Sequence, residues 1–70
     1  MSNVFERVLA EYTELNEKVT RLDDFIHNSE NEEFDRLSVV QRVLLISQLD
    51  AMKTYRHILS LRLSDWDGLL

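Results

Sequence analysis

Apolar residues recur at steps of four and three along the first part of the chain. They are Val8, Tyr12, Leu15, Val19, Leu22 and Ile26. This spacing keeps the side chains on one face of an α-helix, as in the seam of a coiled coil. Asn3 followed by Glu6 supplies an N-cap with a carboxylate three residues later. The pattern predicts a helix over about residues 4–27.

The second half of the chain predicts a helix with a wider apolar surface. Ser38 followed by Gln41 marks its start, and the periodicity continues to about residue 63 or further. One apolar stripe consists of Leu45, Leu49, Met52, Leu59 and Leu63 and continues to Trp66. A second stripe consists of Val40, Leu44, Ala51, Tyr55 and Ile58.

The two stripes together span about half of the helix circumference, and one partner helix covers only about a third. The second stripe therefore needs another surface, and a second copy of the chain would supply it. The predicted oligomer interface consists of Leu44, Ala51, Tyr55, Ile58 and Trp66.

Residues 28–38 interrupt the helical pattern. Asn28, Ser29 and Asn31 favour a turn, and Ser29 followed by Glu32 is a further capping pattern. A short helical turn near residues 30–36 would place Phe34 and Leu37 on the end of the helix pair. The predicted fold is all-α: one domain over residues 1–70, an antiparallel hairpin of two long helices that assembles into a homo-oligomer.

The chain has 70 residues, no proline, one glycine and no cysteine. A domain of this size has a small core and is commonly stabilised by disulfides, metals or self-association. Without cysteine, disulfides and thiolate metal sites are excluded, and His27 and His57 make a poor metal site. We therefore expect self-association, no metal and no cofactor. A cysteine-free chain fits a reducing cytoplasm, and no apolar run is long enough to span a membrane.

The net charge of −5 is unevenly distributed. Residues 1–35 hold ten acids and three bases, whereas residues 36–70 hold three acids and five bases. An acidic chain is a poor partner for a nucleic-acid polymer. The simplest explanation is that an acidic and a basic helix pair in the hairpin. Lys53 and Arg56 follow Arg42 along one edge of the first stripe, and Arg62 lies on the second stripe. The cations of the first stripe either cover apolar surface while their charged heads meet the acids of the first helix, or hold an anion. Arg62 either forms a salt bridge in an interface or holds an anion.

Two segments together resemble a known family. ERVLAEYTELNEKVTRLDDFI (residues 6–26) and LLISQLDAMKTYRHILSLRL (residues 44–63) resemble the helical hairpins of phage anti-defence sponges, the anti-CBASS and Thoeris anti-defence families. The resemblance includes Gln48, Met52 and Tyr55. It implies a homo-oligomer, with a hexamer favoured, in the cytoplasm of the infected bacterium. Such proteins sequester cyclic di- or trinucleotides or cyclic ADP-ribose isomers between protomers, without cleaving them.

The resemblance also implies roles for individual residues. Tyr12 is the natural aromatic residue to stack on a ligand, and Arg56 and Arg62 are the best candidates for phosphate contacts. A lysine that some cyclic-dinucleotide sponges place near the end of the first helix is absent, and His27 or Asn28 stands near that place. The candidate ligand-binding residues are Tyr12, Lys53, Arg56, Arg62 and His27.

Two other functions remain open from the sequence. The chain could be a helical protein-binding module, or an inhibitor of a host protein, whose acidic residues 1–35 meet a basic partner. A helical enzyme of the chorismate mutase type would need several converging cations, such as Lys18, Arg21 and Arg56. No Ser–His–Asp arrangement, glycine-rich phosphate loop or HExxH motif is present. We therefore expect a binding protein with no catalytic residues.

Overall fold

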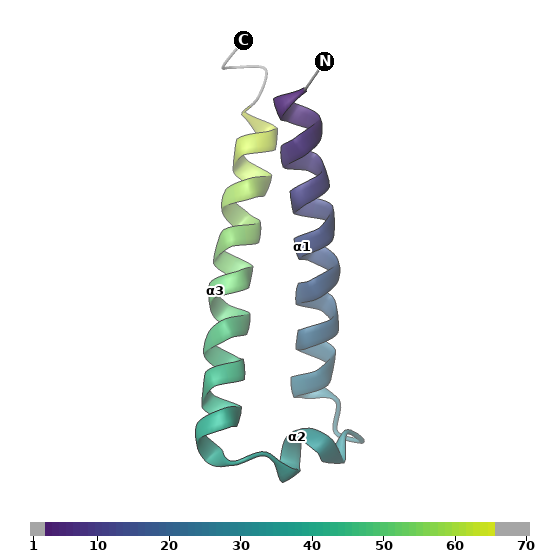
Figure 1. The fold of residues 1–70 in the computed structure, drawn as a ribbon, viewed down its shortest axis with the longest axis vertical. Helices are drawn as coiled ribbons and strands as arrows, with labels where there is room; N and C mark the ends of the chain where they lie inside the picture. Colours follow the sequence, from purple (N-terminus) through teal and green to yellow (C-terminus); the bar gives the residue numbers. More distant parts are fainter. Residues whose placement is uncertain (1–2, 66–70) are drawn as a thin grey trace.

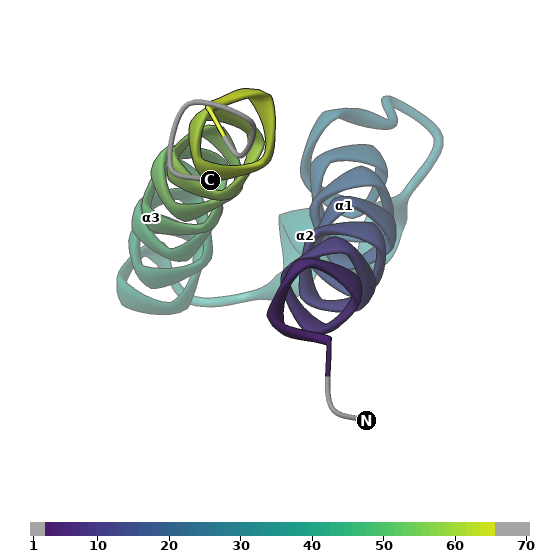
Figure 2. The same cartoon turned by 90° about the horizontal axis from the view of Figure 1, so that it is seen from above.

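The computed structural model describes residues 3–65 and shows two long antiparallel helices (Figure 1). Helix α1 spans Val4–His27, the short helix α2 spans Glu32–Arg36, and helix α3 spans Val39–Ser64. Helices α1 and α3 lie side by side, and α2 lies at the end where they are connected (Figures 1 and 2). The predicted all-α hairpin with a short connecting helix is confirmed. Within the described residues, no helix is both long enough and apolar enough to cross a membrane.

Both long helices begin at the predicted caps. Asn3 Oδ1 accepts a hydrogen bond from the Glu6 backbone N–H at 3.3 Å, and Ser38 Oγ accepts one from Gln41 N–H at 3.1 Å. Each cap satisfies one of the backbone N–H groups that the first turn of a helix leaves without a partner. Helix α3 continues to Ser64, one residue beyond the minimum expected.

The connector differs from the prediction in its cap. Helix α2 is capped by Asn31, whose Oδ1 accepts from Glu33 N–H at 3.1 Å, so the capping role predicted for Ser29 is wrong. The reason is a second bond of the same side chain: Asn31 Nδ2 donates to the Phe25 carbonyl at 2.8 Å. Phe34 then meets Phe25 edge to face, with ring centroids 6.1 Å apart. The connector is thus fixed to the end of α1 by one amide and one aromatic contact.

The core is the apolar seam between α1 and α3. Its buried residues are Val8, Val19, Ile26, Leu49 and Leu59. Half-buried side chains of the α1 seam and of the first stripe of α3, including Leu22 and Met52, pack against Val19, Ile26 and Leu49. The predicted seam of α1 therefore faces the predicted first stripe of α3.

The second stripe of α3 is exposed in the single chain. The exposed fractions of Leu44, Tyr55 and Ile58 are 55%, 42% and 46%, and Ala51 is also exposed. Seen from above, each long helix has the other as its single long neighbour (Figure 2). Trp66, the fifth residue of the predicted interface, lies outside the described residues. The interface itself stays a prediction.

Leu59 is the most enclosed residue of the seam, with no exposed surface. We expect Leu59→Ala to lower the free energy of unfolding by about 2–5 kcal/mol, because the substitution leaves a cavity that the helices cannot fully close. Urea unfolding followed by circular dichroism measures the change. Leu9→Ala is the matched control, since Leu9 is exposed on α1 and should cost much less. Equal losses in the two variants would contradict this description of the core.

Candidate functional site

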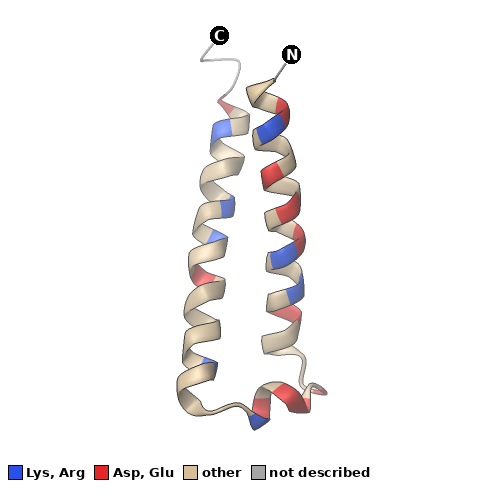
Figure 3. Cartoon of the chain, in the orientation of Figure 1, with Lys and Arg blue, Asp and Glu red and all other residues tan. Residues whose placement is uncertain are grey.

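The seam between α1 and α3 has two polar edges. On α3, Lys53 and Arg56 lie on one side of the first stripe, and Tyr55 and Arg62 lie on the other side. We call these the Lys53 edge and the Tyr55 edge. Each edge is completed by polar residues of α1 that reach the same side. Basic residues dominate the charge of α3, whereas acidic and basic residues mix along α1 (Figure 3).

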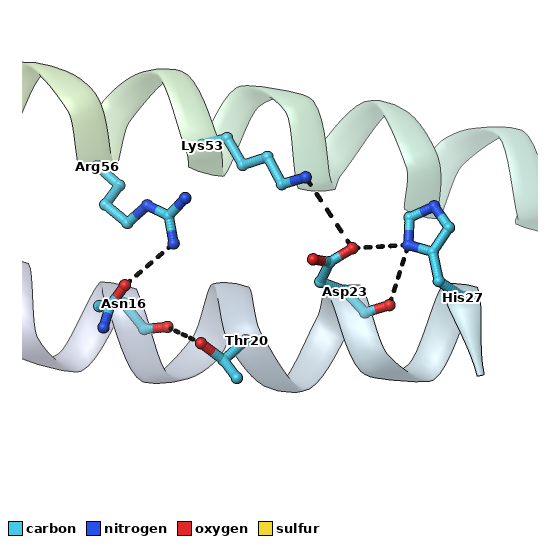
Figure 4. Close-up of polar contacts among 6 residues, drawn as sticks. All are labelled: Asn16, Thr20, Asp23, His27, Lys53 and Arg56. Atoms are coloured by element: carbon cyan, nitrogen blue, oxygen red, sulfur yellow. Dashed lines mark hydrogen bonds and ion pairs between the residues drawn. The ribbon is translucent and has the colours of Figure 1, made fainter.

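Arg56 on the Lys53 edge is held by a neutral group. Its Nη1 donates to Asn16 Oδ1 at 3.0 Å. Asn16 also accepts a hydrogen bond at its backbone carbonyl from Thr20 Oγ1 at 2.9 Å (Figure 4). No carboxylate among the described residues forms an ion pair with Arg56. The half-buried guanidinium is therefore positioned while its charge stays uncompensated.

Lys53 on the same edge faces a carboxylate. Its Nζ lies 3.9 Å from Asp23 Oδ1, and that same oxygen lies 2.6 Å from His27 Nδ1 (Figure 4). The His27 nitrogen is also 3.1 Å from the Asp23 backbone carbonyl. Among the described residues, Lys53–Asp23 is the ion pair that joins the two long helices. We expected an acidic helix to pair with a basic one. Among the described residues, the ion pairing between the two helices consists of this one long, partly exposed contact.

The Tyr55 edge is built around a different acid. The Tyr55 hydroxyl donates a hydrogen bond to a Glu11 carboxylate oxygen. This bond raises the pKa of Tyr55 above its ordinary value, and partial burial and the negative charge of Glu11 act in the same direction. The positive charge of Arg62 nearby lowers the pKa and opposes them. The hydroxyl thus has a partner within the chain, although the ring is partly exposed.

The structure distributes the five candidate ligand residues along the hairpin. Lys53 and His27 meet through Asp23, and Arg56 lies one helical turn from Lys53. Arg62 lies on the other edge, nine residues from Lys53, which corresponds to about 14 Å along a helix. Tyr12 is half-buried on the seam of α1, one turn before Asn16. One chain therefore gathers Lys53, Arg56 and His27 on a single edge and places Tyr12 and Arg62 apart from them.

Three residues of these edges were missed from the sequence: Glu11, Asn16 and Asp23. Asn16 and Asp23 are seven residues apart beside the α1 seam, which puts them on one side of the helix. That spacing in the sequence could have indicated that the two residues lie on the same edge of the seam. The described residues contain no group of three or more histidines and acids placed to hold a metal ion.

The fold defines a small helical hairpin protein in which two long helices pack along a single apolar seam that has polar residues on both edges. The Sequestin family model matches residues 2–65, so the chain belongs to the Sequestin family. This membership agrees with the resemblance to sequestering anti-defence proteins. The family name indicates sequestration of a ligand, and therefore binding rather than catalysis. Searches of curated proteins and of solved structures gave no match.

The Tyr55–Glu11 hydrogen bond predicts a titration behaviour. The chain has two tyrosines, so Tyr12→Phe leaves Tyr55 as the single phenol. In an ultraviolet titration of this variant we expect the Tyr55 pKa to lie above 10.0. Adding Glu11→Ala should bring the pKa back towards that value, and an unchanged midpoint would contradict the bond. Because the folded-state pKa is raised, its contribution to stability is complete below about pH 10 and is lost as pH rises through the folded pKa.

Proposed function

We propose that this protein is a non-enzymatic sponge for cyclic nucleotide messengers. Its ligands would be cyclic di- or trinucleotides or cyclic ADP-ribose isomers, bound between protomers and released unchanged. The observation that carries the proposal is membership of the Sequestin family over residues 2–65. The setting would be the cytoplasm of a phage-infected bacterium, where sequestration keeps an immune messenger from its effector.

The Lys53 edge supports binding of a phosphate-bearing ligand. Arg56 can grip two phosphate oxygens with its planar guanidinium. Asn16 already holds that group in place at 3.0 Å, so part of the ordering cost of binding is met in advance. Lys53, one turn away, offers a second positive charge to the same ligand.

The exposed second stripe supports assembly through α3. Of the ten large hydrophobic side chains that are exposed among the described residues, eight belong to α3. The described part of this 70-residue chain has five buried core residues, and so small a domain gains stability by covering such a surface with a second copy. In the homo-oligomer that we propose, Tyr12 or Arg62 of one protomer would complete the Lys53 edge of another. The separation of these residues in one chain is thus compatible with a site between protomers. Following the family resemblance, we favour a hexamer as the assembly.

The mechanism requires no chemical step. A sponge acts by mass action: bound messenger is removed from the free pool in proportion to the number of sites, as long as the dissociation constant lies below the effector's threshold. The protein must therefore be abundant and bind tightly. A rigid site at the meeting of several helices suits this purpose, because little conformational freedom is lost on binding.

A second candidate function is binding of a host protein. The exposed apolar face of α3 favours it, since an amphipathic partner helix could cover this face instead of a second copy. The two functions differ in the state of the isolated protein. A protein-binding module would be monomeric until its partner is added, whereas a sponge would already be assembled.

The ligand site is tested by calorimetry with a panel of cyclic di- and trinucleotides and cyclic ADP-ribose isomers. We expect at least one to bind, and Arg56→Glu to weaken it by at least about tenfold, because a hydrogen bond to a charged group contributes about 1.5–3 kcal/mol. Arg36→Glu is the matched control: Arg36 pairs with Glu32 on α2, away from the Lys53 edge. Equal loss in both variants, or no heat with any ligand, would contradict the proposed site.

The assembly is tested by the solution mass of the full chain, measured by light scattering. We expect a multiple of the 8.3 kDa chain mass, and about 50 kDa for a hexamer. Ile58→Glu should shift the mass towards that of one chain, because it places a charge on the apolar face. Leu9→Glu makes the same change at an exposed position of α1 and should leave the mass unaltered. A wild-type mass of 8.3 kDa would instead favour the protein-binding module.

A further inference from the structure

We infer that Asp23 is a specificity-determining residue of the Lys53 edge: an internal carboxylate that occupies Lys53 and must be displaced before an external phosphate binds there. The inference rests on the proposed function, and it concerns the selection among anionic ligands rather than the existence of the site.

Asp23 lies where a phosphate oxygen would be received. Its Oδ1 is shared between two nitrogens from different parts of the fold, at 2.6 Å from His27 Nδ1 and 3.9 Å from Lys53 Nζ (Figure 4). A single acceptor oxygen between an ammonium group and a ring nitrogen is the arrangement that a bound phosphate would also adopt. The carboxylate therefore competes with an external anion for the same donors.

The contact is accessible and weak enough to exchange. The Lys53 and Asp23 side chains are 42% and 43% exposed, and their 3.9 Å separation is at the outer limit of an ion pair. Ion pairs this exposed contribute little to stability, because water screens the two charges. An anion from solvent can thus reach Lys53, at the cost of this contact and of repulsion from the displaced carboxylate.

Arg56 provides the contrast within the same edge. Its partner is the neutral Asn16 amide, so an anion that binds Arg56 displaces no carboxylate that is ion-paired with it among the described residues. A ligand with one anionic group can therefore bind at Arg56 alone. A ligand with a second anionic group gains from Lys53 after it displaces Asp23. Asp23 thus sets how much the second anionic group contributes to affinity.

Asp24 is a matched control for this role. It carries the same charge one position along α1, it is exposed, and it takes part in no ion pair between the described residues. One residue along a helix corresponds to a rotation of about 100°, which turns Asp24 away from the Lys53 edge. Asp23→Asn and Asp24→Asn therefore change the net charge equally but differ in contact with Lys53.

The test uses the full chain at one ionic strength with two probes. The first is inorganic pyrophosphate, followed by the amide resonances of Lys53 and Arg56. The second is each cyclic nucleotide that binds the wild-type protein in calorimetry. We expect Asp23→Asn to tighten binding about 1.4- to fivefold, the range that corresponds to an exposed ion pair. Asp24→Asn should leave it close to the wild-type value. In a Lys53→Gln background the gain from Asp23→Asn should vanish, because no ammonium group is left for Asp23 to occupy. A gain that came from helix stability would instead persist in this background.

The possible outcomes distinguish failure of this inference from failure of the proposed sponge function. If the wild type binds a cyclic nucleotide but the two asparagine variants behave alike, the inference is overturned and the sponge stands. If no cyclic nucleotide binds but Asp23→Asn alone tightens pyrophosphate at Lys53, the sponge fails and the inference stands. Weaker binding by Asp23→Asn, or a gain that survives Lys53→Gln, would also overturn it.

Discussion

The packing of α1 against α3 along one apolar seam is the contact on which the rest of the structure depends. Its five buried residues set the register of the two helices, and the register decides which polar groups meet. Glu11 faces Tyr55, Asn16 faces Arg56 and Asp23 faces Lys53. A slip of one turn would keep apolar residues in contact but separate all three pairs. The site is therefore a consequence of core packing, because each edge residue reaches its partner only in this register.

A two-helix fold also explains why the charged groups are near solvent. Each long helix has a single long neighbour, so the residues that flank the seam cannot be fully buried (Figure 2). A cation in this position loses little hydration yet is held by its neighbour across the seam. This combination suits reversible binding of an anion, whereas a deeply buried cation would carry a desolvation cost. The small core that limits stability is thus what leaves Lys53 and Arg56 available.

The elements of this fold follow from local rules, which is why the sequence predicts them. Steps of four and three and the Asn3 and Ser38 caps depend only on neighbours within a turn. The cap of α2 does not: Ser29 and Asn31 are both suitable, and the choice depends on the tertiary bond from Asn31 to Phe25. The partners on each edge are also tertiary. Charge alone predicts acids opposite bases, but the register places an amide opposite Arg56.

The two edges place a constraint on the proposed assembly. The residues of the Tyr55 edge lie on the second stripe, whereas Lys53 and Arg56 lie on the opposite side of the first stripe. A dimer formed through the second stripe alone would therefore leave the Lys53 edge facing solvent. A site between protomers needs a further neighbour across that edge. Closed assemblies of dihedral symmetry provide more than one kind of contact, so a ligand held between protomers on the Lys53 edge would need an assembly larger than a simple dimer.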